Sequence, residues 1–149
     1  MRTRQIKEKD YEFFSKYARA EDVAECLSVS NKPLADRIKF GKEVSLESFA
    51  FVDENDNACA LYGIYETGGV YCVWLLTTVF IEEHKLSFMK RLLKVVKKWY
   101  KVYGKLNVLA DLRYERAIKL INWAGFKRVG EAISINGVDF GLYRFYGEK

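Results

Sequence analysis

The feature that most constrains the fold is a long amphipathic segment, residues 84–103, between two apolar segments, residues 70–80 and 106–109. At about 100° per residue, its apolar side chains fall on one side of a helix, as expected for a helix that covers a sheet. Residues 70–80 are apolar almost throughout, which is typical of a central strand that is buried on both faces. A strand, a helix and a second strand in this order form a right-handed parallel crossover. The sequence therefore predicts a mixed α/β fold.

Shorter patterns on both sides of the crossover complete the predicted order of elements. Gly41 and Gly125 each follow a helical pattern, so we expect them to end helices. Asn136-Gly137 between two alternating segments is the strongest short signal of a β-hairpin. The remaining predicted elements are strands at 1–6, 49–52, 58–65, 128–135 and 138–146, and helices from Asp10, around 23–27, at 31–41 and at 113–124.

The length and the cysteine content limit the classes of protein. The 149 residues suffice for one domain with a core, so we expect a single domain over residues 1–149. No apolar run reaches the length of a membrane span, and the charged N-terminus does not resemble a secretory signal. Cys26, Cys59 and Cys72 are widely spaced, and His84 is the only histidine, which argues against a disulfide framework and a zinc site. We expect a cytoplasmic protein with reduced thiols, without a metal and without a membrane partner.

The net charge of +5 is concentrated in one segment, residues 85–105. This segment has 8 of the 25 basic residues and no acidic residue, which leaves 17 basic and 20 acidic residues elsewhere. Like charges four residues apart, as at Lys90 and Lys94, destabilise a helix by about 0.2–0.5 kcal/mol per pair. The pattern is compatible with a solvated surface or with an anionic partner, either nucleic acid, an acidic protein or a phosphate-rich cofactor. The predicted surface for an anionic partner consists of Lys90, Lys94, Lys97, Lys98 and Lys101.

The stretch from Ala117-Ile118 to Gly125-Phe126 resembles a motif of the GNAT-type N-acetyltransferase superfamily. The order of elements resembles this superfamily over nearly the whole chain. The resemblance implies a GNAT-like acyltransferase fold, in which two central parallel strands splay apart and acetyl-CoA binds. The pantetheine arm would pair with the edge of strand 70–80, and the pyrophosphate would lie at the start of the next helix. The cofactor-binding residues that it implies are Leu76, Thr77, Thr78, His84, Lys85 and Ser87.

A narrower resemblance concerns a GNAT-like family of short-tailed phages, the internal virion protein A type. It rests on Trp74-Leu75-Leu76 with Thr78, on the basic helix, and on Asp111 and Arg113 before the Gly125-Phe126 ending. This resemblance implies a phage protein, located in the host cytoplasm or in the virion.

Several positions depart from the superfamily pattern, among them Tyr114, which stands where the superfamily has an asparagine. Ser87 and Met89 stand where its two glycines would lie, and a methionine hinders the close approach of backbone to pyrophosphate. Ile121 stands where the superfamily has the tyrosine that protonates the leaving thiolate. Two hypotheses follow: an N-acetyltransferase or acyl-CoA binder with a degenerate pyrophosphate loop, or an inactive GNAT-fold module. The inactive module would bind nucleic acid, or a host or virion protein, through the basic helix 85–105.

The catalytic residues stay unassigned, with Asp111 and Tyr143 as candidates. Asp111 follows the second splayed strand, where ligands of open α/β sheets bind, so it could act as a base. It could also pair with Arg113 or cap the next helix. Tyr143 could reach the same cleft from the last strand or could pack in the core. His84 could contact a phosphate or act as a base, or it could be a surface residue at the helix start.

Overall fold

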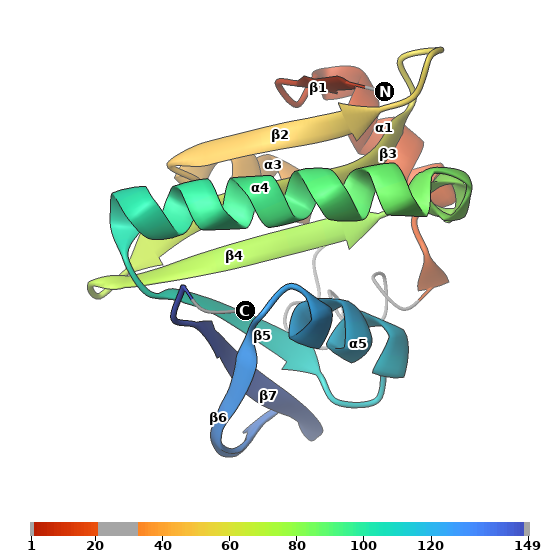
Figure 1. Cartoon of the computed structure of the whole chain (residues 1–149). Coiled ribbons are helices and arrows are strands. Elements are labelled where there is room, and N and C mark those ends of the chain that lie inside the picture. Colours follow the sequence, from red (N-terminus) through yellow and green to blue (C-terminus); the bar gives the residue numbers. More distant parts are fainter. Residues whose placement is uncertain (1, 21–32, 148–149) are drawn as a thin grey trace. The chain divides into compact units, whose positions relative to one another are not determined.

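The computed structural model describes residues 2–20 and 33–147, and these form a mixed α/β fold as predicted (Figure 1). Seven strands are hydrogen-bonded in the order β1-β2-β3-β4-β5-β7-β6. The helix expected around residues 23–27, with Cys26, lies outside the described residues. In chain order the elements are β1 (Arg2–Arg4), α1 (Glu8–Tyr17), α3 (Leu34–Val44), β2 (Glu47–Val52), β3 (Ala58–Thr67), β4 (Val70–Thr77), η1 (Val79–His84), α4 (Lys85–Tyr103), β5 (Leu106–Asp111), α5 (Glu115–Trp123), β6 (Lys127–Ile135) and β7 (Val138–Phe145).

The chain divides into two compact units that share β4 and α4. The first unit comprises Met1–Tyr65 and Trp74–Phe88, and the second comprises Glu66–Val73 and Met89–Lys149. Each unit has buried aromatic and aliphatic side chains of its own.

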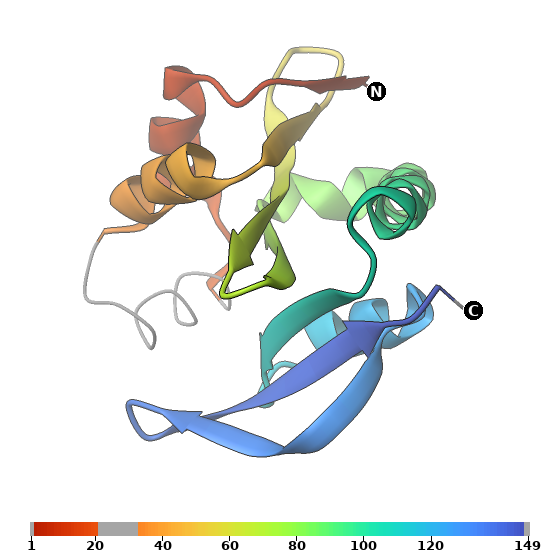
Figure 2. The same cartoon turned by 90° about the vertical axis from the view of Figure 1, so that its left-hand side faces the viewer.

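The first unit is built on antiparallel pairing of β1 with β2 and of β2 with β3. Helices α1 and α3 lie beside each other (Figure 2) and supply Phe14 and Ile38 to a core that also holds Ala50 and Leu61. Helix α1 begins with Lys7 as its N-cap, where the Asp10 carboxylate accepts the Lys7 backbone N–H at 2.8 Å. This contact satisfies a backbone donor that the start of the helix would otherwise leave exposed.

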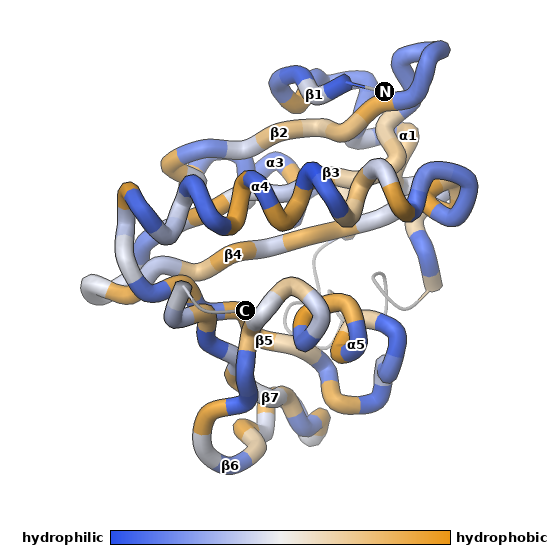
Figure 3. The backbone as a smooth tube through the Cα atoms, in the orientation of Figure 1, coloured by the Kyte–Doolittle hydropathy of each residue, from blue (hydrophilic) through white to orange (hydrophobic). Residues whose placement is uncertain are grey.

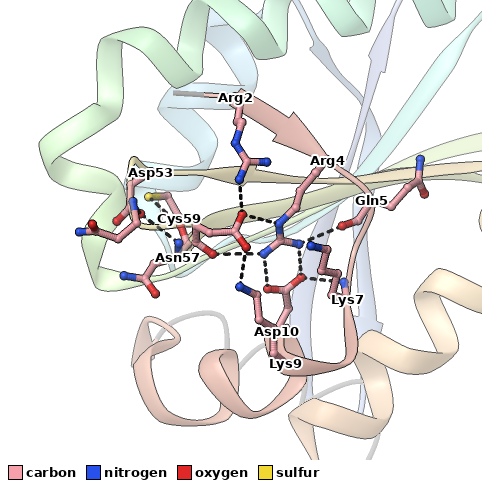
Figure 4. A network of polar contacts seen from close by, with 11 residues as sticks. Arg2, Arg4, Gln5, Lys7, Lys9, Asp10, Asp53, Asn57 and Cys59 are labelled. Carbon is pink, nitrogen blue, oxygen red and sulfur yellow. Dashed lines mark hydrogen bonds and ion pairs between the residues drawn. The ribbon is translucent and has the colours of Figure 1, made fainter.

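A network of ion pairs joins β1, α1 and the turn between β2 and β3. Figure 4 shows Arg4 facing Asp10, and their side chains are only 8% and 2% exposed. Arg4 donates to both Asp10 carboxylate oxygens at 2.8 and 2.9 Å and to Asp56 at 2.8 Å. Hydrogen bonds from Lys9 and Arg4 lower the pKa of the Asp56 carboxyl well below its usual range. The buried guanidinium of Arg4 is tolerated because its N–H groups donate to the Asp10 and Asp56 carboxylates, which also balance its charge.

The prediction that Gly41 ends a helix is wrong, because α3 continues through it to Val44. The Trp74 indole lies against this glycine, so that a Cβ added at Gly41 would meet the ring at 3.6 Å. The same ring covers Gly63 of β3, where an added Cβ would lie 2.6 Å from Nε1. The indole Nε1–H donates to the Ser45 hydroxyl at 2.8 Å. Gly41 therefore admits an aromatic ring instead of ending a helix.

The second unit confirms the predicted parallel crossover and the hairpin. Strands β4 and β5 pair parallel to each other at two residue pairs, Tyr71↔Leu106 and Cys72↔Asn107. Strands β5 and β7 pair antiparallel along their length, and β6 and β7 form a long hairpin (Figure 2). Asn136 and Gly137 have positive φ angles of 51° and 80°, as a tight hairpin turn requires.

The predicted end of helix α5 is also confirmed. Gly125 has a φ angle of 103°, in the region that favours glycine, and α5 ends at Trp123. The backbone N–H of Phe126 donates to the Ile121 carbonyl at 3.1 Å, and the Phe126 ring packs on Phe145 with centroids 5.4 Å apart. Gly125-Phe126, on which the GNAT resemblance partly rests, thus caps the C-terminal end of α5 and buries the phenylalanine ring.

Candidate functional site

Strand β4 ends at Thr77, three residues before the predicted end at residue 80. The next residue, Thr78, is fully buried and is still hydrogen-bonded to β3. Its backbone N–H donates to the Cys59 carbonyl at 2.9 Å, and its hydroxyl donates to the Ala58 carbonyl at 3.1 Å. The Thr78 carbonyl then accepts the Ile81 N–H at 3.1 Å and starts the 3₁₀ helix η1.

The joint between β4 and α4 is helical throughout. η1 runs from Val79 to His84, and α4 follows at Lys85, which already has helical φ and ψ angles of −55° and −48°. Because η1 directly precedes α4, the backbone N–H groups in the first turn of α4 can donate to carbonyl groups of η1. We expect contacts to a phosphate here to come from side chains instead of a cradle of backbone amides.

All six residues predicted to bind a cofactor lie in the first unit, along the end of β4, η1 and the start of α4. Leu76 packs against the core, and Thr78 is occupied by its bonds to β3. Lys85 and Ser87 are exposed, and Thr77 and His84 are half-buried. The structure therefore separates the six into two residues that hold the strand and four that a ligand could reach.

Sequence reasoning missed Arg19, which the structure places at the end of β4. The Arg19 backbone N–H donates to the Thr77 carbonyl at 3.2 Å, and Ala18 forms an isolated antiparallel bridge with Thr78. The Arg19 guanidinium lies 3.4 Å from the Glu82 carboxylate of η1. A single bridge between residues so distant in the chain leaves no periodic pattern, so no sequence signal could have found it.

The contact of Arg19 falls on a particular edge of β4. Backbone groups of successive strand residues point to opposite edges, and the Thr78 N–H points to β3. The backbone groups of Thr77 and Leu75 therefore point away from β3. This is the edge with which the GNAT resemblance pairs the pantetheine arm. Arg19 already occupies one acceptor on it.

Asp111 and Tyr143, the candidate catalytic residues, belong to the second unit. The Asp111 side chain is fully buried and accepts two hydrogen bonds from the Arg113 Nε, at 3.0 and 3.2 Å, and one from Nη2 at 2.7 Å. Burial raises the pKa of the Asp111 carboxyl, but the hydrogen bonds from Arg113 outweigh burial and lower it below its usual range. Such a carboxylate is a weak base with an engaged partner. Tyr143 is 4% exposed and packs beside Gly141.

Helix α4 presents its lysines to solvent. Lys90, Lys94, Lys97, Lys98 and Lys101 are all exposed, whereas Leu92, Val96 and Trp99 are buried. Figure 3 shows hydrophilic and hydrophobic stretches alternating along the α4 tube, as the amphipathic pattern predicts.

Two classes of site are not found in the part of the chain that the structure describes. Residues 2–20 and 33–147 contain no group of three or more His, Cys, Asp or Glu side chains that could hold a metal ion. No helix within these ranges has the length and apolar content needed to cross a membrane.

The fold has close counterparts among solved structures, although no protein-family model and no curated protein sequence matches the chain. A GNAT-family acetyltransferase from Bacillus anthracis superposes with a TM-score of 0.72 at 12% identity, over 99% of this chain and 95% of that chain. A variant of spermidine N-acetyltransferase from Vibrio cholerae gives 0.65 at 11% identity, over 99% and 95% of the two chains. An N-acetyltransferase from Staphylococcus aureus gives 0.66 at 16% identity, over 99% and 98%.

These likenesses extend over nearly the whole of both chains in each comparison, while their sequence identities stay low. They concern the path of the backbone, since so low an identity says nothing of individual side chains. The chain has the fold of the GNAT acetyltransferases.

Proposed function

We propose that this protein is an acyl-CoA-dependent N-acyltransferase that transfers an acetyl group to an amine. The observation that carries the proposal is the GNAT acetyltransferase fold, matched over 99% of the chain. The second support is the motif from Ala117-Ile118 to Gly125-Phe126, which forms the helix cap described above.

The residues at the end of β4 fit the two ends of an acyl-CoA in different ways. Leu75 directs its backbone groups to the edge away from β3, where the amides of a pantetheine arm would pair. Lys85, His84 and Ser87 would hold the pyrophosphate through their side chains, because the helical joint offers no glycine turn. Lys85 contributes the charge, and Ser87 contributes a hydroxyl donor.

Two acidic residues limit the affinity for the pyrophosphate. Glu82 and Glu83 are exposed in η1, directly before His84 and Lys85. The Arg19 guanidinium lies 3.4 Å from Glu82 and offsets part of this negative charge. We infer a degenerate pyrophosphate loop that binds more weakly than a glycine-rich one. A phage source, which the narrower sequence resemblance implies, belongs to the same proposal.

Acetyl-CoA, when bound, supplies an activated acetyl thioester. The acceptor amine forms the new C–N bond as the C–S bond breaks, and the amine loses a proton while the thiolate gains one. Ile121 occupies the position at which the superfamily resemblance expects an acid tyrosine, so we infer that water protonates the thiolate. Asp111 is engaged by Arg113, and we assign it the role of fixing the loop after β5.

Ligand-dependent melting tests the binding step. A ligand present at about 100 times its dissociation constant stabilises a fold by roughly 2.7 kcal/mol, which is a visible melting shift. We expect CoA and acetyl-CoA to raise the melting temperature and the Lys85→Glu variant to lose most of this shift. Lys39→Glu is the matched control, because Lys39 is an exposed residue of helix α3.

Release of free thiol from acetyl-CoA, measured with a chromogenic disulfide, tests the chemistry. Spermidine and a peptide with a free α-amine are suitable first acceptors, since polyamine acetyltransferases are among the structures with this fold. An absence of both a melting shift and thiol release at millimolar acetyl-CoA would refute the proposed function. A shift without thiol release for any amine would reduce it to acyl-CoA binding.

A further inference from the structure

The outer side of α4 carries six basic side chains, Lys90, Arg91, Lys94, Lys97, Lys98 and Lys101, which we call the basic face. All six are exposed. At about 100° per residue they fall within an arc of roughly 120°. The flanking exposed apolar residues of α4, Leu86 and Val102, lie outside this arc by the same geometry.

The basic face is part of a unit with a strong excess of positive charge. The second unit contains 14 Lys and Arg against 6 Asp and Glu, a formal net charge of +8. One of these acids, Asp111, is engaged by Arg113. In the part of the chain that the structure describes, none of the five lysines of the basic face makes an ion pair. Their charge is therefore available to a partner.

The spacing of the lysines opposes the stability of the free helix. Lys94 has like-charged neighbours four residues away at Lys90 and Lys98, and three residues away at Arg91 and Lys97. Such neighbours are close together on the surface of a helix and repel each other. Helix α4 contains no acidic residue in its 19 positions that would relieve this repulsion.

The chemistry of the basic face favours one class of partner. Protein interfaces are depleted in lysine and are centred on apolar or aromatic side chains, whereas this arc has five lysines and no large apolar residue. Single-stranded nucleic acid is bound by stacking its bases on aromatic rings. No aromatic residue lies in this arc, because Trp99 is buried and the half-buried Tyr100 and Tyr103 fall on other sides of α4 by the same geometry. Duplex phosphates need only positive charge in a row, which this face supplies.

We propose that the basic face binds the phosphate backbone of double-stranded nucleic acid without reading its sequence. Lys90 and Lys101 are eleven residues apart, so the row is about 16 Å long at 1.5 Å per residue. This length equals the axial rise of about five base pairs at 3.4 Å each, over which both strands present phosphates to the helix. The flexible stems of the five lysines reach about one phosphate each, which gives about five contacts. Lysines act here as mobile point charges, which suits backbone contact and gives no base readout. This activity does not depend on acyl-CoA.

Salt dependence measures the number of contacts. Binding of a fluorescent 20-base-pair DNA duplex would be followed by anisotropy between 50 and 200 mM salt, without CoA. Five phosphate contacts predict a slope of log K against log salt near −4.5, and an affinity loss of about 500-fold across this range. An RNA duplex should bind with a similar slope. An equally tight complex with a single strand would overturn the duplex assignment.

Two charge-matched variants locate the contact. Lys94→Glu/Lys98→Glu should reduce the magnitude of the slope by about two or more and weaken binding at least tenfold. Lys39→Glu/Lys119→Glu changes the net charge by the same amount at exposed positions of α3 and α5, and it should bind nearly as the parent does. Equal losses in both variants would mean attraction by overall charge and would overturn the proposal.

A stability readout separates loss of contact from loss of fold. In the Lys94→Glu/Lys98→Glu variant, the carboxylate at position 94 attracts Lys90, Arg91 and Lys97, and the carboxylate at position 98 attracts Lys101. These attractions outweigh the one repulsion that remains between positions 94 and 98, so the variant should melt at or above the parental temperature. A variant that binds weakly because it is unfolded would instead melt earlier. Absence of duplex binding by the parent at 50 mM salt, or equal affinity for polyglutamate, would refute a nucleic-acid partner.

Discussion

The contact between Trp74 and Gly63 gives a prediction whose size follows from the structure. An added Cβ at Gly63 would lie 2.6 Å from Trp74 Nε1, 2.8 Å from Cε2 and 2.9 Å from the backbone carbonyl oxygen of Glu47. Distances below 3.0 Å to a ring and to backbone require both to shift, and such overpacking costs about 1–3 kcal/mol. The Gly63→Ala variant should therefore melt about 2–12 °C below the parent, since 1 kcal/mol corresponds to roughly 2–4 °C at this size.

Gly41 supplies the matched control for this prediction, because it faces the same indole from helix α3. An added Cβ there would meet the ring at 3.6 Å, an ordinary contact, so that Gly41→Ala removes only the entropy penalty of glycine. We expect Gly41→Ala to stabilise the fold by about 0.5–1 kcal/mol, opposite in sign to Gly63→Ala.

A double-mutant cycle tests the cause, with denaturant unfolding as the assay. Trp74→Phe removes the ring atoms nearest to Gly63, so Gly63→Ala should cost at least about 1 kcal/mol less in that background. Equal costs of Gly63→Ala in both backgrounds would refute the role of the indole. The remaining cost would then come from the Glu47 carbonyl.

Three further predictions concern single groups. Burial raises the pKa of the Cys59 thiol to about 11. In a variant with Cys26 and Cys72 replaced by serine, Cys59 should therefore react with a thiol reagent at pH 8 only as fast as the protein unfolds. Rapid labelling of the native state would contradict this. Arg113→Met should destabilise the fold by about 1–3 kcal/mol at pH 7, because it leaves a buried carboxylate without its guanidinium partner and with only the backbone N–H of residue 113 as a donor. The pKa of Asp111 is lowered in the fold, so the stabilisation of the fold by the Asp111–Arg113 pair is present above the unfolded pKa and is lost as the pH falls through the folded pKa. Urea unfolding at pH 7 and below pH 3 should therefore show that the cost of Arg113→Met becomes smaller in acid. Arg19→Pro removes the N–H that occupies the Thr77 carbonyl, and Ala18 already has a φ of −58° and a ψ of 148° that suit a following proline. By calorimetry it should bind CoA up to about tenfold more tightly than Arg19→Ala, which keeps the N–H and loses the guanidinium.

The sequence predicted the elements that rest on local patterns. Alternation around Asn136-Gly137 marked the hairpin, and the glycine with the following phenylalanine marked the end of α5. The crossover of β4, α4 and β5 followed from segments long enough to show their period. In each case the residues that determine the structure are neighbours in the chain.

The errors have the opposite cause, since contacts between distant segments decided them. A glycine such as Gly41 often ends a helix, but here it lies inside α3 and packs against the Trp74 ring from β4. Strand β4 stops at Thr77, and after Thr78 has bonded to the Ala58 and Cys59 carbonyl groups of β3, the 3₁₀ helix η1 begins where the sequence predicted more strand. Arg19 reaches the same strand end through one backbone hydrogen bond. The sequence located the candidate site at the end of β4 but could not show what already occupies it.

The helix dipole separates the lysines of α4 that stability can explain from those that it cannot. Lys101 lies in the last turn, where a cation interacts favourably with the C-terminal end of the helix. This effect decays within one turn, so it does not extend to Lys90, Lys94 or Lys97. These three residues are exposed, make no ion pair among the described residues and repel their neighbours. Their presence in the middle of the helix is costly for the free protein, and a row of phosphates on a bound duplex would remove that cost.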